Sequence, residues 1–295
     1  MPDLRGDQAA GLRRMLAGER LRIVTFAAAG EGVGRSHVVA NLAAALARQG
    51  RTVLVVDENS AQDNVAGLFG IASGHDMLDV IQGRSRLDAV LLDPEPGLSI
   101  LPAARAVNTL GRLSRRQQDD LLAALVDRVT VPDVILVDAA HDHPLGCSPF
   151  ALAAPETVVV LSATGAAITA AYSLIKRFSQ AFGRKHFRIL VNKVRAADDA
   201  ERVFTNLARV AAQHGVANLA YAGSVPLDEA LTHASRCLRS VVSAFPDAPS
   251  SLAFRGLAAD LLRWPQTEEP AGLEQFMRQL LHLSQRITPM AIHAG

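Results

Sequence analysis

Residues 22–57 carry the pattern that most constrains what this chain can fold into. The apolar run Ile23–Ala27 leads into the glycine-rich stretch Ala29–Ser36 (AGEGVGRS), and apolar residues then recur at helical spacing from Ser36 to Gln49. Thr52–Asp57 (TVLVVD) is almost wholly apolar, which is typical of a strand buried on both faces of a parallel sheet. The segment therefore predicts a right-handed β-loop-α-β unit.

The glycine-rich stretch predicts a phosphate-binding loop. Glycines let backbone N–H groups approach phosphate oxygens, and the N-terminus of the following helix adds partial positive charge. The residues expected to contact the nucleotide here are Gly32, Val33, Gly34, Arg35 and Ser36. The match to G-x-x-x-x-G-K-[ST] is imperfect, because Ala29 stands for the first Gly and Arg35 for the Lys. Taken alone, the loop also fits a glycine-rich turn of an unrelated α/β protein.

A second apolar strand, Asp133–Asp138 (DVILVD), ends in a carboxylate. The carboxyl ends of parallel strands share one edge of the sheet, so Asp138 is expected beside the loop. There it would hold Mg²⁺, directly or through water. The alternative is an ordinary turn or helix-capping aspartate.

The rest of the chain alternates strands with helices, which predicts one mostly parallel sheet with helices on both faces. The further predicted strands are Leu98–Pro102, Thr157–Ser162, Phe187–Val191 and Ala217–Val225. The further predicted helices are Met77–Gln82, Leu113–Val129, Ile168–Phe182, Ala200–His214, Glu229–Ala234 and Ser250–Leu262. After Pro270, apolar residues from Leu273 to Ile287 fall on one face of an amphipathic helix. That helix could attach to a membrane or pack on its own domain; its few basic residues favour packing.

Composition limits the function classes. Of the 295 residues 49% are hydrophobic, which is ample for a buried core, and the net charge of +1 gives no general argument for nucleic-acid binding. The two cysteines, Cys147 and Cys237, are far apart, which suits a reducing cytoplasm. No signal peptide or membrane span is apparent, so we expect a cytoplasmic protein. His141 and His143 have spacing that could bind metal, but a polar loop is the simpler account.

Four stretches resemble the FlhG/FleN family of flagellar-number regulators, within the MinD/ParA class of P-loop ATPases. Asp7–Arg14 (DQAAGLRR) resembles that family's activator motif DQAxxLR, and GEGVGRS resembles its P-loop KGGVGK[ST]. Ile168–Lys176 (ITAAYSLIK) resembles ITDAYALIK, with Ala170 in place of Asp, and Gly223–Ala234 (GSVPLDEALTHA) resembles G-x-I-P-x-D-x-x-V-x-x-A. The DQAxxLR motif distinguishes the FlhG/FleN family from other MinD-like proteins, which lack it.

The resemblance implies a three-part organisation. Residues 1–20 would be a partner-activating helix, 21–264 a P-loop NTPase-like domain and 271–290 the amphipathic helix. It also implies ATP and Mg²⁺ as ligands, with Ser36, Asp57 and Asp138 at the metal and Asn192 at the adenine edge.

The departures from the family pattern concern catalysis. Gly30 replaces a Lys that reaches the partner's nucleotide across a dimer, and Glu31 replaces a Gly. Asn59 replaces the second Asp of a D-x-D motif, which acts on the attacking water. A carboxylate about 4 Å from a phosphate at an effective dielectric of about 20 repels it by roughly 4 kcal/mol. These changes predict weak ATP binding and slow or absent hydrolysis, and leave no confident catalytic residue.

By resemblance, the chain regulates flagellar number and placement through protein contacts. The implied partners are the GTPase FlhF, flagellar basal-body proteins and a flagellar transcription activator. The residues expected to contact FlhF are Asp7, Gln8, Ala9, Leu12 and Arg13. Peripheral attachment to the inner membrane face through the C-terminal helix remains open. The alternatives are an active MinD-like ATPase that dimerises on ATP and binds membrane, and a metabolic P-loop enzyme, which the absence of a suitable cysteine pair disfavours.

Overall fold

The computed structural model describes residues 21–107, 109–128, 132–140, 148–265 and 272–292, and its strands form one eight-stranded sheet. The strand order is β3-β4-β2-β5-β1-β6-β7-β8. The strands are β1 (Arg22–Ala28), β2 (Val53–Asp57), β3 (Leu92–Glu95), β4 (Leu98–Pro102), β5 (Val134–Asp138), β6 (Glu156–Ser162), β7 (His186–Val194) and β8 (Asn218–Pro226). All neighbouring pairs are parallel except β3–β4, which confirms the predicted fold class.

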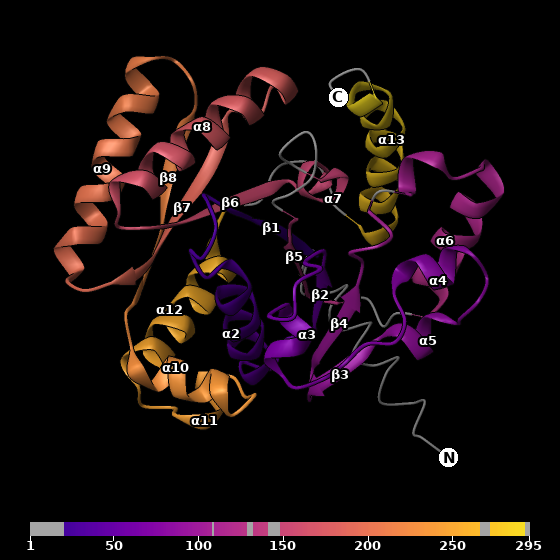
Figure 1. Ribbon diagram of the computed structural model, residues 1–295, viewed down its shortest axis with the longest axis horizontal. Coiled ribbons are helices and arrows are strands. Elements are labelled where there is room, and N and C mark those ends of the chain that lie inside the picture. The colour runs from indigo at the N-terminus through magenta and orange to yellow at the C-terminus, as the bar shows by residue number, and fades with distance from the viewer. Residues whose placement is uncertain (1–20, 108, 129–131, 141–147, 266–271, 293–295) are drawn as a thin grey trace.

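Helices cover both faces of the sheet (Figure 1). Helices α2, α3 and α12 lie on one side, while α7, α8 and α13 lie on the other. The longer helices are α2 (Arg35–Arg48), α6 (Arg115–Arg128), α8 (Gly165–Phe182), α9 (Ala197–Gln213), α10 (Glu229–Arg236), α12 (Pro249–Arg263) and α13 (Leu273–Ile292). The short ones are α3 (Val65–Leu68), α4 (Met77–Ile81), α5 (Leu87–Val90), the 3₁₀ turn η1 (Leu110–Arg112), α7 (Pro149–Ala153) and α11 (Val241–Ala244).

The central strands explain why the sheet is buried on both faces. Every residue of β2 and β5 is buried, as their near-continuous apolar sequences VLVVD and VILVD predict. Helix α2 is buried along most of its length because it lies between the sheet and α12. Its small alanines, Ala43 to Ala45, allow this close double packing.

Helix α13 packs against its own domain. Its apolar face is covered by η1, α7 and α6, and Leu280 and Leu281 are buried there. The Phe276 ring lies 6.4 Å from the Phe150 ring of α7, centroid to centroid. The apolar face predicted for this helix therefore packs on the rest of the domain. This is the alternative that the scarcity of basic residues on the helix favoured.

The structure adds elements that the sequence reading missed. Strand β3 (LDPE) contains Asp93 and Pro94, which are rare in strands, and pairs only at the edge of the sheet. Helix α7 is a single turn, capped by Ser148 and started by Pro149, and is too short to show periodicity. These elements lie at the margins of the sheet and leave its predicted centre unchanged.

Candidate nucleotide-binding site

The loop after β1 has the backbone that its glycines predict. Gly30, Gly32 and Gly34 all have positive φ, at 103°, 67° and 85°, which residues with a side chain rarely adopt. Gly34 also lies against Asn192, and a Cβ at this position would be 2.6 Å from the Asn192 Nδ2 atom. The loop ends at the N-terminus of α2, where backbone N–H groups are available to an anion.

Two side chains at the end of β7 hold this loop through hydrogen bonds. Asn192 donates its Nδ2–H to the Val33 carbonyl at 2.8 Å, and Lys193 donates its Nζ–H to the Gly32 carbonyl at 2.7 Å. The expected contact of Asn192 with an adenine edge stays a prediction; in this structure its amide group holds the loop. Lys193, given no role from the sequence, has φ of 58°, a strained value of the kind often found at functional sites.

The predicted acidic residues meet beside the loop. Asp57 and Asp138 are directly paired in the register of β2 and β5, at the same edge of the sheet. Both Asp138 oxygens accept hydrogen bonds from α2, one from Arg35 Nε and the other from Ser36 Oγ at 2.6 Å. Asn59 donates its Nδ2–H to Ser36 Oγ at 3.1 Å. The structure thus brings Arg35, Ser36, Asp57, Asn59 and Asp138 together, as the sequence predicted.

Two buried carboxyl groups in this region have raised pKa values. Burial, and then the neighbouring charge of Asp138, raise the pKa of Asp57 to about 7. Burial raises the pKa of Glu58 to about 7, against the opposing effects of the Ser148 hydroxyl and the Ala140 amide. The Ala140 N–H donates to Glu58 Oε2 at 2.7 Å. Glu58 faces the interior, which the strand-end position alone did not indicate.

The side chains expected at Mg²⁺ do not fit that ion in their present arrangement. Oxygen atoms of Ser36, Asp57 and Asp138 are suitable donors chemically. However, the Arg35 guanidinium, which is only 6% exposed, pairs with Asp138, and protein N–H groups occupy Asp57 on both oxygens. The described residues also contain no group of three or more His, Cys, Asp or Glu that could hold a metal.

Two of the positions that depart from the family pattern, Gly30 and Glu31, lie in the loop between β1 and α2, and a third, Asn59, follows β2. Gly30 and Glu31 are exposed, so solvent screens the Glu31 carboxylate. Asn59 is partly buried, and its Oδ1 accepts a hydrogen bond from the Ala61 N–H at 3.1 Å. An amide held in this way cannot take a proton from water.

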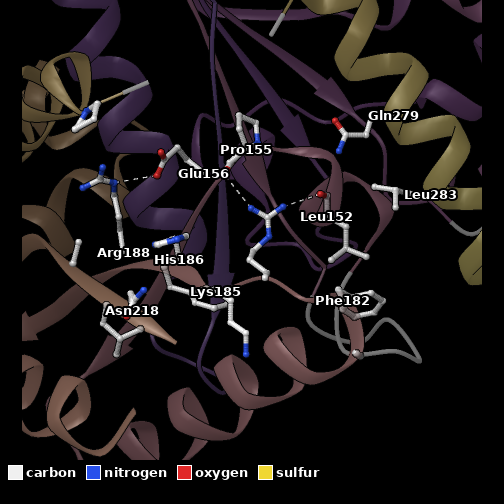
Figure 2. Close-up of a pocket in the computed structure, with 16 residues that line it drawn as sticks. Leu152, Pro155, Glu156, Phe182, Lys185, His186, Arg188, Asn218, Gln279 and Leu283 are labelled. Atoms are coloured by element: carbon white, nitrogen blue, oxygen red, sulfur yellow. Dashed lines mark hydrogen bonds and ion pairs between the residues drawn. The ribbon is translucent and has the colours of Figure 1, made fainter. Parts of the chain in front are cut away.

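A cavity of about 940 Å³ lies at the opposite end of the strands from the loop, where β6, β7 and β8 begin (Figure 2). Its wall includes Leu152, Phe182 and Leu283, and Arg188 pairs with Glu156 at its rim. None of the predicted nucleotide-site residues lines it. The cavity is therefore separate from the loop.

Several predicted features lie outside the described residues. They are the motif Asp7–Arg14, with its expected contacts Asp7, Gln8, Ala9, Leu12 and Arg13, together with His141, His143 and Cys147. Cys237 is described and is exposed. None of the helices in the described part of the chain has the length and apolarity that a membrane crossing needs.

Comparison with known proteins agrees with this geometry. The family model of the CobQ/CobB/MinD/ParA nucleotide binding domain matches residues 24–237. The antiactivator FleN of Pseudomonas aeruginosa is 33% identical over 271 residues, which cover 92% of this chain and 97% of FleN. The chain belongs to the FlhG/FleN family. The flagellum site-determining protein YlxH of Helicobacter pylori is 26% identical, over 85% of this chain and 86% of YlxH.

Solved structures place the FlhG/FleN family chain in the MinD fold. The MinD cell division protein of Aquifex aeolicus matches with a TM-score of 0.63 and 18% identity, covering 84% of this chain and 99% of that one. The septum site-determining protein MinD from Pyrococcus horikoshii, complexed with Mg-ADP, matches with a TM-score of 0.60 and 19% identity, covering 82% and 96%. At these identities the likeness shows the fold.

Proposed function

We propose that this chain regulates flagellar number and placement through protein contacts, with a nucleotide site that binds weakly and hydrolyses ATP slowly or not at all. The observation that carries the proposal is the 33% identity to the antiactivator FleN over nearly its whole length. The match to a flagellum site-determining protein supports the same biological role. The motif DQAAGLRR adds the expectation of a specific partner.

That partner is the GTPase FlhF. Gln8 and Leu12 are four residues apart, so on a helix they share one face, with Arg13 beside them. An apolar anchor flanked by an amide and a cation can dock in a groove and place its polar groups at a catalytic site. In this proposal Gln8 positions water for GTP hydrolysis by FlhF, and Arg13 contacts FlhF.

Two replaced residues in the site support a weakened ATPase. A positioned cation contributes most in the transition state of phosphoryl transfer, and Gly30 removes the one that would act across a dimer. Asn59 cannot act on the attacking water as an aspartate does. ATP remains the expected ligand because the loop backbone and Ser36 are retained.

The test is the GTPase rate of the cognate FlhF with and without the full-length protein. We expect stimulation, lost for the most part in Gln8→Ala and retained in Arg14→Ala, a matched control outside the fixed positions of the motif. A rate that the full-length protein leaves unchanged contradicts the proposed partner.

A further inference from the structure

The Arg35 guanidinium is buried at the point where the family pattern places a metal ion. It is 6% exposed, and its carboxylate partner Asp138 is fully buried. A charge this deep is stable only when paired, and Asp138 supplies the pairing. Ser36 Oγ, another of the ligands expected for the metal, donates a hydrogen bond to the same carboxylate.

The pairing uses only one edge of the guanidinium. Arg35 bonds Asp138 through Nε, and neither Nη1 nor Nη2 makes a hydrogen bond to any described residue. These two atoms carry four of the five N–H donors of an arginine. A planar pair of N–H donors that no protein group occupies matches the oxygens of a phosphate.

Arg35 is also the first residue of α2, directly after the phosphate-binding loop. A guanidinium bonded to Asp138 at this position can connect the carboxylate to a phosphate, as a divalent cation does in a metal-dependent site. A lysine ammonium is a compact point charge with three donors, so when bonded to Asp138 it cannot also present a planar pair of donors to a phosphate.

We propose that Arg35 is a built-in cation which replaces Mg²⁺, so that this site binds the phosphates of a nucleotide without a metal ion. The proposal rests on the nucleotide binding proposed above and adds its ion requirement. A single positive charge neutralises less of the phosphate charge than Mg²⁺, which agrees with weakened affinity.

The experiment is calorimetric titration of the full-length protein with ADP, in excess Mg²⁺ and in EDTA. The wild-type dissociation constant should change by less than about threefold between the two buffers. The variant Arg35→Lys should bind at least about tenfold more weakly in EDTA than in Mg²⁺, because an ammonium bonded to Asp138 offers no planar pair of donors to the phosphate. Arg48→Lys, at the exposed end of the same helix, is the matched control and should behave as wild type.

The possible results distinguish a failure of this inference from a failure of the proposed function. A wild-type affinity that falls about threefold or more in EDTA overturns the inference, whether or not Arg35→Lys folds. Absence of ADP binding in both buffers overturns the inference and the nucleotide-binding part of the proposed function together. Stimulation of FlhF is measured independently and is not affected by either result.

Discussion

Replacing the buried Glu58 by Gln should stabilise the protein at alkaline pH and have little effect at acid pH. Glu58 is 2% exposed, and burial raises its pKa from the ordinary 4.5 to about 7. The folded state therefore binds the proton more tightly than the unfolded state. This contribution to stability is fully present below pH 4.5 and is lost as the pH rises through about 7.

The size of the effect follows from the two pKa values. The interval from 4.5 to about 7, at about 1.4 kcal/mol per pKa unit, corresponds to about 3 kcal/mol of lost stability above pH 7. Glutamine keeps an oxygen to accept the Ala140 N–H and carries no charge to bury. Glu58→Gln should accordingly gain up to about 3 kcal/mol over wild type at about pH 8, and close to nothing at about pH 4.

The measurement is urea denaturation of both proteins across this pH range, in EDTA so that no divalent cation binds the neighbouring carboxylates. Glu201→Gln, which removes an exposed carboxylate from α9, is the control for the loss of one negative charge. A stability difference between Glu58→Gln and wild type that does not vary with pH refutes the reasoning. So does a variant that is less stable than wild type at about pH 8.

Three further predictions concern assembly, packing and catalysis. Because Gly30 stands where the family pattern has a Lys expected to reach across a dimer, ATP should not shift the mass measured by light scattering, and an ATP-induced dimer contradicts this. Leu280→Ala, at a fully buried site on α13, should lower the free energy of unfolding by about 2–5 kcal/mol, whereas an exposed, membrane-bound helix would show almost no loss. The triple variant G30K/E31G/N59D should release phosphate from ATP faster than wild type, and unchanged turnover in the folded variant argues against the roles given to these positions.

The fold was largely predictable because the central strands are continuous apolar runs that can be recognised in the sequence. β2 and β5 are apolar runs ending in Asp57 and Asp138, and parallel topology brings the two carboxylates to one edge. Strand β3 was not predictable, because its Asp and Pro disfavour a strand and tertiary pairing with β4 overrides them.

The residues that make up the candidate site could be predicted from the sequence, but the contacts between their side chains could not. Arg35, Ser36 and Asp138 were expected near one another, yet nothing in the sequence says that Arg35 turns inward to the carboxylate. Side-chain direction depends on what surrounds the helix terminus, which no short motif specifies. Lys193 shows the same limit, since its contact with the Gly32 carbonyl joins residues far apart in sequence.

Phosphate release from Mg-ATP tests the central claim of a weakened ATPase most directly. Steady-state turnover should be at a trace level in the full-length wild-type protein and indistinguishable from that of Asp138→Ala. Magnesium-dependent turnover by the wild type that disappears in Asp138→Ala would contradict the account.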